Sequence, residues 1–569
     1  MWITRVCGVC FVSLAMMACH SSTKNDDEQG DAGSGDTGQN DAGSVKESDE
    51  AMFDPTRVVE VEIEIDPVDW DVLRYEGREL ATLFSGCAED LEYTYFDVTA
   101  TIDGNKVEHV GVRKKGYLGS LSVLRPSLKI NFGKFAPGQT YSGMKRMTLN
   151  NDRQDPSHTH QVMSYALFRE AGVVSPRANF AHVTVNGEDL GFYTHVESIK
   201  KPFLARHFDD NDGNRYEGQG ADFMPEAVHE FQRKTNETGD GGAAPDRSDL
   251  DRVVDALQVE DSELVEALGK VVDLDAFITF WAVEVITGHW DGYAGNKNNF
   301  YTYHDPTTDL FYFIPWGTDG AFAEDHSFLP DLPKSVYAWG QLAYRLYSFP
   351  ETRALYHEKL ESLLKNNWNE NTLLAEVDRI EALVSSHEGA LEYQRTFLTG
   401  RKDSILAELV DEGPEWIWPP YDSTYECNDP VEISGSFDTI WSTGEMNYTW
   451  GNGVSLTLTL FGEEQEFESI VNSAGSEDEE DTSYMSIGFY AERADSNPLY
   501  ISLIMPTELA KIGEVSFHGV ETMGILFELV GPEDPRMVGY IGNGSITFET
   551  VSTSDGDQIK GSFSGLMSQ

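Results

Sequence analysis

The chain has 569 residues, and its 97 acidic side chains against 41 basic ones give a net charge of −56 at neutral pH. Such an acidic surface repels phosphate backbones, which argues against nucleic-acid binding. A hydrophobic content of 40% suffices for several packed domains, and five cysteines are too few for a disulfide framework. The composition therefore predicts a multidomain globular protein with no nucleic-acid partner.

The N-terminus predicts export. Arg5 precedes a mostly apolar run from Val6 to Ala18, which is too short to span a bilayer but matches the hydrophobic part of a signal peptide. The run ends in Met16-Met17-Ala18-Cys19, which resembles a loose bacterial lipobox. We therefore expect residues 1–19 to be a lipoprotein-type signal, with Cys19 carrying the lipid. An ordinary cleaved signal peptide is the alternative.

Residues 20–53 predict an acidic, low-complexity tether. Nine acidic and two basic residues stand between His20 and Glu50, with almost no apolar side chain to drive folding. No later stretch reaches about 18 consecutive apolar residues, so membrane contact is expected only through the lipid. The protein would then be an exported lipoprotein of the bacterial cell envelope or cell surface, in which Cys87 and Cys427 remain as thiols able to pair.

Residues 54–412 predict an α+β body with two lobes. Val59, Val61 and Ile63 alternate with glutamates, the period of a half-buried strand, and Asn186-Gly187 predicts a hairpin. The pattern is β-rich to about residue 196, apart from a helix expected over 157–170. It becomes helical from about residue 250, with a β insert over 299–315. This order predicts a β-rich N-lobe and a mainly helical C-lobe, with a cleft between them.

Residues 425–569 form a separate region after Pro414, Pro419 and Pro420. Short alternating runs separated by turns predict a small all-β domain, which we interpret as a sandwich. Much of the acidic excess lies here, because the region has only four basic residues.

One pair of segments can carry chemistry. Asp291 is followed by Asn296 and Asn299, and Asp319 comes after the β insert. A carboxylate that orients a hydroxyl, with a carboxamide and a second carboxylate for Mg²⁺, is what phosphoryl transfer requires. The spacing alone favours the plainer interpretation, in which the aspartates cap turns among core aromatic residues.

A wider set of ordered motifs resembles the CotH (spore coat protein H) family of secreted, atypical protein kinases over about residues 58–409. The matching segments are Gly111-Val112-Arg113-Lys114-Lys115-Gly116, Arg125-Pro126-Ser127-Leu128-Lys129-Ile130-Asn131-Phe132, Leu149-Asn150-Asn151 with Asp155-Pro156-Ser157, Val185-Asn186-Gly187, Gly191-Phe192-Tyr193, 291–303, and Pro315-Trp316 leading to Asp319.

The resemblance implies ATP as cofactor with Mg²⁺ or Mn²⁺, and a role for each candidate residue. Asp291 would be the catalytic aspartate and Asp319 a metal ligand. Asn296, at the offset of ordinary kinases, or Asn299, at the start of the strand as in the family, would be the other metal ligand. The residues implied to bind the nucleotide are Lys129, Arg113 and Lys115 at the phosphates and Glu197 beside the adenine; without the resemblance they could equally be surface cations and a helix cap.

The chain departs from the family at two points. CotH-like sequences commonly read Pro-Trp-Asp-x-Asp, but Gly317 stands at the first of these aspartates. The helix over 157–170 offers only Glu170 as a carboxylate partner for Lys129. Two functions therefore remain: a kinase acting on Ser or Thr of extracytoplasmic proteins, and a non-catalytic pseudokinase that serves surface binding or adhesion.

Overall fold

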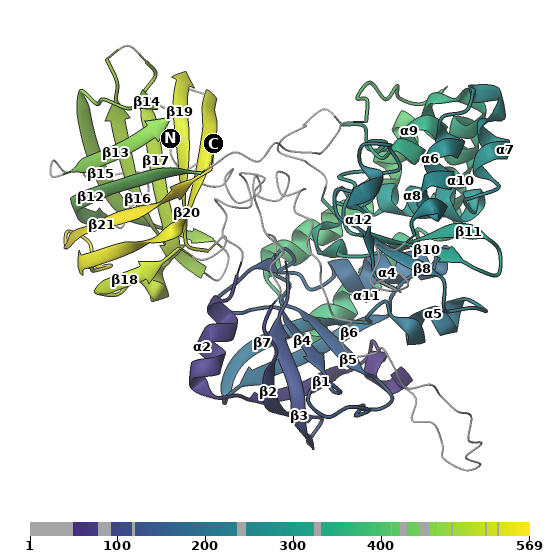
Figure 1. Ribbon diagram of the computed structural model, residues 1–569, viewed down its shortest axis with the longest axis horizontal. Coiled ribbons are helices and arrows are strands. Elements are labelled where there is room, and N and C mark those ends of the chain that lie inside the picture. Colours follow the sequence, from purple (N-terminus) through teal and green to yellow (C-terminus); the bar gives the residue numbers. More distant parts are fainter. Residues whose placement is uncertain are drawn as a thin grey trace.

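The computed structural model describes residues 49–77, 93–116, 120–235, 246–323, 332–410, 412–420, 430–442, 454–460, 463–479, 482–494, 496–517, 521–531 and 534–568. The predicted signal peptide, Cys19, most of the tether, Cys87 and Cys427 lie outside these residues. Over the described ranges no helix combines the length and apolar character that a membrane crossing needs. Strands and helices are mixed up to residue 410, and the C-terminal region consists mainly of strands (Figure 1).

The N-terminal strands close into a barrel in the order β1-β2-β3-β4-β5-β7-β6. The barrel strands are β1 (Val58–Glu64), β2 (Phe96–Ile102), β3 (Asn105–Lys114), β4 (Leu128–Asn131), β5 (Arg146–Asn150), β6 (Ala178–Val185) and β7 (Glu188–Val196). Closure depends on parallel pairing of β1 with β6, from Val58 opposite Phe180 to Ile63 opposite Val185. The predicted alternation along β1 is confirmed, because Val59, Val61 and Ile63 are buried inside the barrel.

Among the residues that the structure describes, the helices α2 (Pro67–Tyr75) and α4 (His160–Glu170) accompany the barrel. The predicted hairpin at Asn186-Gly187 is confirmed, with positive φ at both residues joining β6 to β7. The helix expected from Ser157 begins instead at His160, with Thr159 at the N-cap position. The Ser157 hydroxyl hydrogen-bonds to Asp155 and Thr159, so it stabilises the preceding turn.

The next part, which we call the helical part, packs helices around a four-stranded sheet of order β11-β10-β8-β9. Its strands are β8 (Asn214–Gly218), β9 (Gln232–Arg233), β10 (Phe300–Asp305) and β11 (Leu310–Pro315). Its helices are α5 (Lys201–His207), α6 (Ser248–Leu257), α7 (Leu264–Leu268), α8 (Leu274–Ile286), α9 (Gln341–Ser348), α10 (Pro350–Asn366), α11 (Glu370–Leu383) and α12 (Glu388–Glu408). The β10–β11 hairpin confirms the predicted β insert. Helix α8 is apolar on nearly every side and almost fully buried, as expected of a central helix.

The C-terminal strands do not form the predicted sandwich. They are β12 (Val431–Ser442), β13 (Ser455–Leu460), β14 (Glu463–Glu464), β15 (Ser469–Glu479), β16 (Thr482–Glu492), β17 (Leu499–Pro506), β18 (Gly513–Ser516), β19 (Met523–Gly531), β20 (Asp534–Thr550) and β21 (Gln558–Met567). Strand β12 pairs with both β15 and β21, and β21 pairs with β20, so the pairing runs round in a ring. One curved, barrel-like sheet results, which we call the C-terminal sheet. Alternation of apolar and polar residues identifies strands with one buried face. It does not show whether the edge strands of the sheet pair with each other.

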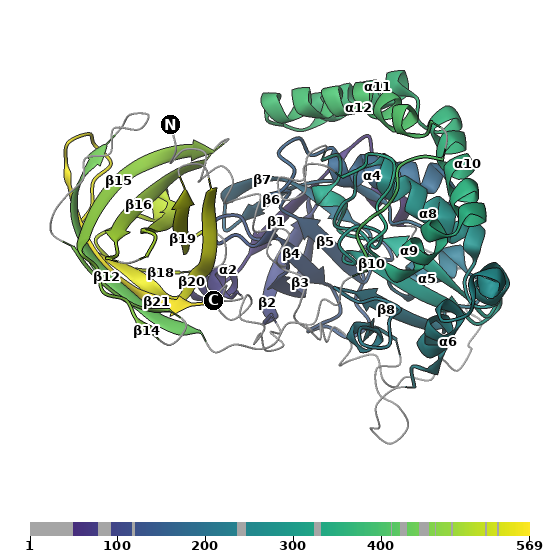
Figure 2. The same ribbon diagram turned by 90° about the horizontal axis from the view of Figure 1, so that it is seen from above.

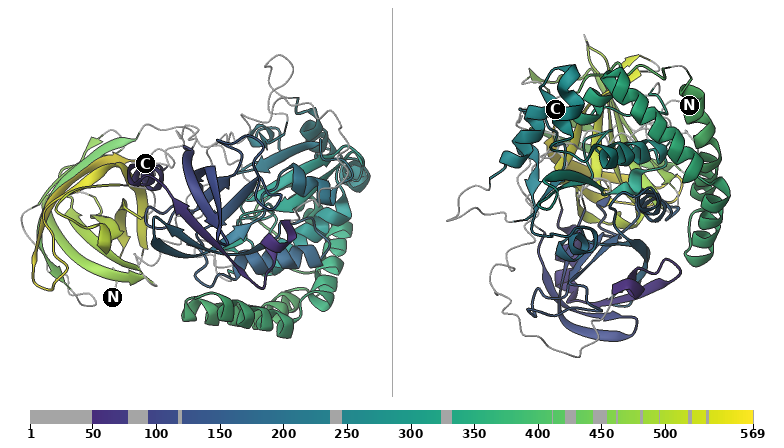
Figure 3. Two further views of the ribbon diagram at one scale, coloured as in Figure 1. Left: turned by 90° about the horizontal axis from the view of Figure 1, so that it is seen from below. Right: turned by 90° about the vertical axis from the view of Figure 1, so that its right-hand side faces the viewer.

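The barrel lies between the other two parts. Figure 2 and the left panel of Figure 3 show β1–β7 with the C-terminal sheet on one side and the helices on the other. Hydrogen bonds join the barrel region to both, from Val123 to Glu521 of the C-terminal sheet and from Asn150 to Asp319 of the helical part.

Candidate functional site

The loop between α8 and β10 is shaped by a buried carboxylate. Glu284 of α8 is fully buried and accepts hydrogen bonds from the backbone N–H groups of Tyr293 at 2.8 Å and Ala294 at 3.0 Å. Burial raises the pKa of Glu284 to about 8. A Cβ on Gly292 would lie 2.1 Å from Glu284 Oε1, so only glycine permits this approach. Glu284 thus fixes the loop that carries Asp291.

Asp291 is half-buried and surrounded by carboxamides. Asn296 Nδ2 donates to Oδ1 at 2.7 Å, and Asn299 Nδ2 donates to Oδ2 at 2.6 Å. Asn298, which the sequence analysis did not single out, lies 3.3 Å from both oxygens. Burial raises the pKa of Asp291 to about 7, and the negative charge of Asp319 acts in the same direction. Both asparagines that the sequence offered are therefore in direct contact with Asp291.

Asp319 lies in a short 3₁₀ turn, Thr318–Gly320, directly after β11, and is 7% exposed. Its carboxylate accepts a hydrogen bond from Asn150 Nδ2, at the end of β5, at 3.3 Å. Its backbone carbonyl accepts one from His160 Nδ1, at the start of α4, at 2.7 Å. The barrel and its helix thus hold the turn that carries Asp319, although the sequence analysis assigned no role to Asn150 or His160.

Lys115, which follows β3, lies within electrostatic range of Asp319. Its backbone N–H donates to Ser127 O at 2.9 Å. Burial lowers the pKa of its ammonium, while the charges of Asp319 and Asp152 oppose that shift. Arg113, two residues earlier, is 4% exposed and lies over the rings of Tyr93 and Tyr95. The structure therefore places Lys115 within electrostatic range of Asp319 and packs Arg113 against aromatic side chains.

Lys129 of β4 lies within electrostatic range of a carboxylate that the sequence analysis did not single out. Its charge acts on Glu217 of β8, which is 6% exposed. Burial alone would raise the pKa of Glu217. The Lys234 ammonium 3.0 Å away and the Tyr301 hydroxyl at 2.7 Å nevertheless hold this pKa below its usual range. The expected candidate, Glu170, is exposed at the end of α4.

The carboxylates of Asp291 and Asp319, with the neighbouring carboxamides, suit a hard cation that also keeps water and phosphate ligands. The described residues contain no cluster of three or more His, Cys, Asp or Glu that could hold a metal ion by themselves. Asp291 and Asp319 supply two carboxylates whose charges interact, and the carboxamides beside Asp291 supply further oxygen atoms. Mg²⁺ is characteristically bound through one or two carboxylates together with substrate phosphates. The donor set therefore fits such an ion.

Comparison with known proteins supplies the family. The family model for CotH kinase proteins matches residues 112–409, which is more than half of the chain. The chain belongs to the CotH family. It is 26% identical to inner spore coat protein H of Bacillus subtilis over 264 residues, covering 44% of this chain and 72% of that protein. It is 23% identical to invasin CotH2 of Rhizopus delemar over 303 residues, and 24% identical to invasin CotH3 over 292. These two matches cover 49% and 48% of this chain, and the chain spans about half the length of each invasin.

The CotH departure at Gly317 has a structural counterpart. Gly317 has φ of +51°, and a Cβ there would lie 2.5 Å from both Cγ and Oδ1 of Asn299. The Asn299 carboxamide therefore occupies space that a side chain at position 317 would need.

Glu197 lies just after β7, on the segment leading from the barrel to α5 and β8. Its carboxylate binds Arg177 at 2.8 Å and Arg206 at 2.5 Å. Although burial opposes it, these two guanidinium groups hold the pKa of Glu197 below its usual range. The segment connects the barrel to α5 and β8, and the Glu197 carboxylate is engaged in ion pairs.

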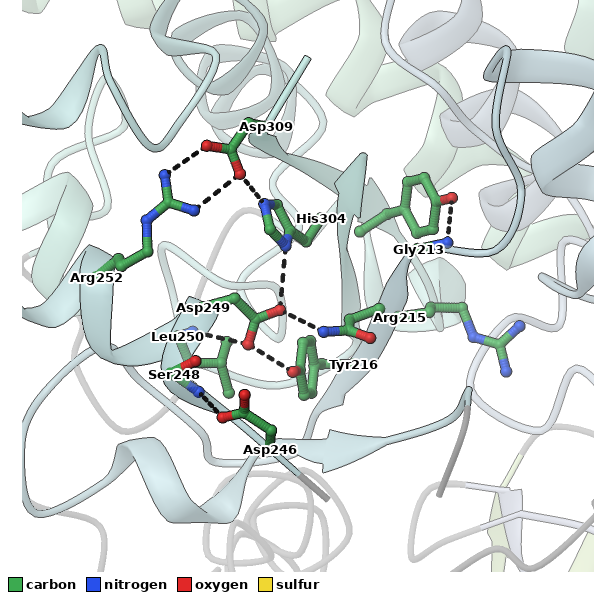
Figure 4. Close-up of polar contacts among 12 residues, drawn as sticks. Gly213, Arg215, Tyr216, Asp246, Ser248, Asp249, Leu250, Arg252, His304 and Asp309 are labelled. Atoms are coloured by element: carbon green, nitrogen blue, oxygen red, sulfur yellow. Dashed lines mark hydrogen bonds and ion pairs between the residues drawn. The ribbon is translucent and has the colours of Figure 1, made fainter. Parts of the chain in front are cut away.

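A second polar cluster in the CotH region joins α6 to the four-stranded sheet of the helical part (Figure 4). His304 Nε2 contacts Asp309 at 2.9 Å and Nδ1 contacts Asp249 at 3.2 Å. Arg252 donates to both oxygens of Asp309, and Tyr216 donates to Asp249 at 2.7 Å. The hydrogen bonds to Asp249 and then Asp309 raise the pKa of His304. These side chains bond to one another between α6 and the strands of the sheet. We therefore assign the cluster a structural role, which is to stabilise the fold.

Proposed function

We propose that this CotH protein is an exported kinase-like enzyme that transfers the γ-phosphoryl group of ATP to Ser or Thr of extracytoplasmic proteins. In this proposal the barrel and the helical part are the two lobes of an atypical kinase. The observation that carries it is the convergence of Asp291, Asp319 and Lys115, which come from the helical part and from the barrel. This is the charge arrangement that phosphoryl transfer requires.

Each residue then has a defined task. Asp291 accepts the proton of the attacking hydroxyl at a carboxylate oxygen, and its carboxamide donors fix the orientation of that group. Asp319, with Asn296 or Asn299, is assigned to Mg²⁺ or Mn²⁺, which when bound would neutralise charge on the triphosphate. Lys115 and Lys129 are assigned to the phosphates from the barrel side, with Arg113 supporting them.

Labelled ATP with Mn²⁺ tests this proposal on the full chain. Asp291→Asn and Asp319→Asn should abolish incorporation of label into protein. Asp275→Asn is the matched control, because that side chain is 85% exposed and pairs only peripherally with Lys359. Absence of labelling and of metal-dependent nucleotide binding in the wild type would refute the enzyme. Labelling that survives both site substitutions would refute the assigned residues.

A non-catalytic surface-binding protein is the second candidate, and one observation favours it. Gly317 replaces a carboxylate that CotH-like sequences commonly carry, and Asn299 fills the adjacent space. The relatives CotH2 and CotH3 are named invasins, which is compatible with binding at a surface. Nucleotide binding without transfer of label would support this alternative.

The proposed location follows from the N-terminus and from relatives named as spore coat and invasin proteins. We place the protein at the cell envelope or surface, anchored through lipid on Cys19. Cys19→Ser should release it from the membrane fraction, whereas unchanged fractionation would rule out the lipid anchor.

A further inference from the structure

The loop between β3 and β4 borders the candidate phosphate-binding lysines, since Lys115 precedes it and Lys129 follows it. We call its residues 120–127 the β3–β4 loop. Asn151 holds both ends of this loop: its Nδ2 donates to Ser120 O at 3.2 Å and to Arg125 O at 2.7 Å, and its N–H donates to Ser127 Oγ at 2.9 Å. These ends are thus attached to the segment that follows β5.

The middle of the loop is attached to a different part of the protein. The backbone N–H of Val123 donates to Glu521 Oε2 at 2.7 Å, across 398 positions of sequence. Glu521 precedes β19 in the C-terminal sheet and is 5% exposed, and Val123 is 3% exposed. A buried carboxylate is costly unless it is paired or hydrogen-bonded, so a contact of this kind is specific.

Electrostatics add to the same contact. Lys114, the last residue of β3, lies close enough to Glu521 for their charges to interact. Burial lowers the pKa of Lys114 to about 8, and the negative charge of Glu521 opposes that shift. Glu521 therefore receives one backbone donor and one nearby positive charge, both from the barrel.

We propose that Glu521 is a positioning residue through which the C-terminal sheet sets the conformation of the β3–β4 loop and hence the affinity of the CotH domain for a nucleoside triphosphate. The loop contact rests on the geometry above, and the effect on nucleotide rests on the proposed function. Undocking of the C-terminal sheet would free the Val123 N–H and loosen the loop between the two lysines. The appended sheet then regulates the site without contributing a residue to the reacting atoms.

Hydrogen exchange of the full chain tests the docking contact independently of activity. Glu521→Ala should accelerate exchange of the Val123 amide by about tenfold or more, because the loop loses its central acceptor. Glu521→Gln keeps an acceptor oxygen but loses the charge, so it should give a smaller acceleration. Glu514→Gln, an exposed residue of β18 in the same sheet, is the control and should leave the loop unchanged. Equal exchange in wild type and Glu521→Ala would overturn the proposal.

Binding of ATP with Mn²⁺ tests the consequence. Glu521→Ala should weaken binding by about fivefold or more, with kcat unchanged, and Glu521→Gln should recover part of the affinity. Unchanged or tighter binding in Glu521→Ala would overturn the claim on nucleotide affinity, and tighter binding would instead identify an inhibitory contact. A wild-type protein that binds no nucleotide would refute the proposed function, and the exchange experiment would then decide the docking contact alone.

Discussion

Gly292→Ala tests how the loop that carries Asp291 is held. The new Cβ would lie 2.1 Å from Glu284 Oε1 and 2.8 Å from His289 Cδ2, and both side chains are fully buried. Glu284 must move away, which breaks its hydrogen bonds with Tyr293 and Ala294. Each orphaned buried N–H costs about 1 to 3 kcal/mol, so the pair gives a loss of about 2 to 6 kcal/mol in the free energy of unfolding.

The matched control is Gly138→Ala. Gly138 has φ of +87°, and a Cβ added there would meet nothing within 4 Å, so its substitution costs only backbone strain. That strain is about 1 kcal/mol. Urea unfolding followed by tryptophan fluorescence gives the difference between the two variants, and hydrogen exchange at Tyr293 and Ala294 localises it. A Gly292→Ala protein no less stable than Gly138→Ala, with unchanged exchange, would refute the role of Glu284.

Three further variants test separate contacts. Gly317→Asp should lower Tm by displacing the Asn299 carboxamide at a position with positive φ, and a higher Tm would contradict this. His304→Gln should flatten the pH dependence of Tm: because the folded pKa is raised above 6.5, its stabilisation is full below that pH and is lost as pH rises through the folded pKa. A scan from about pH 5.5 to about pH 8.5 checks it. Glu217→Gln should cost about 3 kcal/mol or more in urea unfolding, since it leaves the Lys234 ammonium buried without its counter-charge; a loss near zero would show that the hydrogen bond from Lys234 to Gln232 suffices without that charge.

The sequence predicted features that short-range physics determines. Strand alternation in β1 and the Asn186-Gly187 hairpin follow from side-chain period and tolerance of positive φ, and both are confirmed. Contacts between distant segments were not predictable in this way. The parallel β1–β6 pairing that closes the barrel, like the ring of the C-terminal sheet, depends on which edges meet after folding.

The candidate site shows the same division. Asp291 and Asp319 stand in motifs with a recognisable order, so the sequence could single them out as candidates. Glu217 carries no local signal, because its relation to Lys129 exists only once β8 lies against the barrel. Glu284 does carry one: a single acidic residue in an otherwise apolar stretch near the end of a central helix is costly to bury unless it holds something.

The net charge of −56 thus says little about the site, because the charged residues that matter there lie on particular strands and loops. Lys114, Lys115 and Lys129 lie on adjacent barrel strands or directly after them, and each has a carboxylate from another segment within electrostatic range. Those carboxylates are Glu521 of the C-terminal sheet for Lys114, Asp319 of the helical part for Lys115 and Glu217 of β8 for Lys129. The barrel therefore meets a carboxylate of the C-terminal sheet at Lys114 and carboxylates of the helical part at Lys115 and Lys129, so docking and the proposed phosphate binding use neighbouring but different lysines.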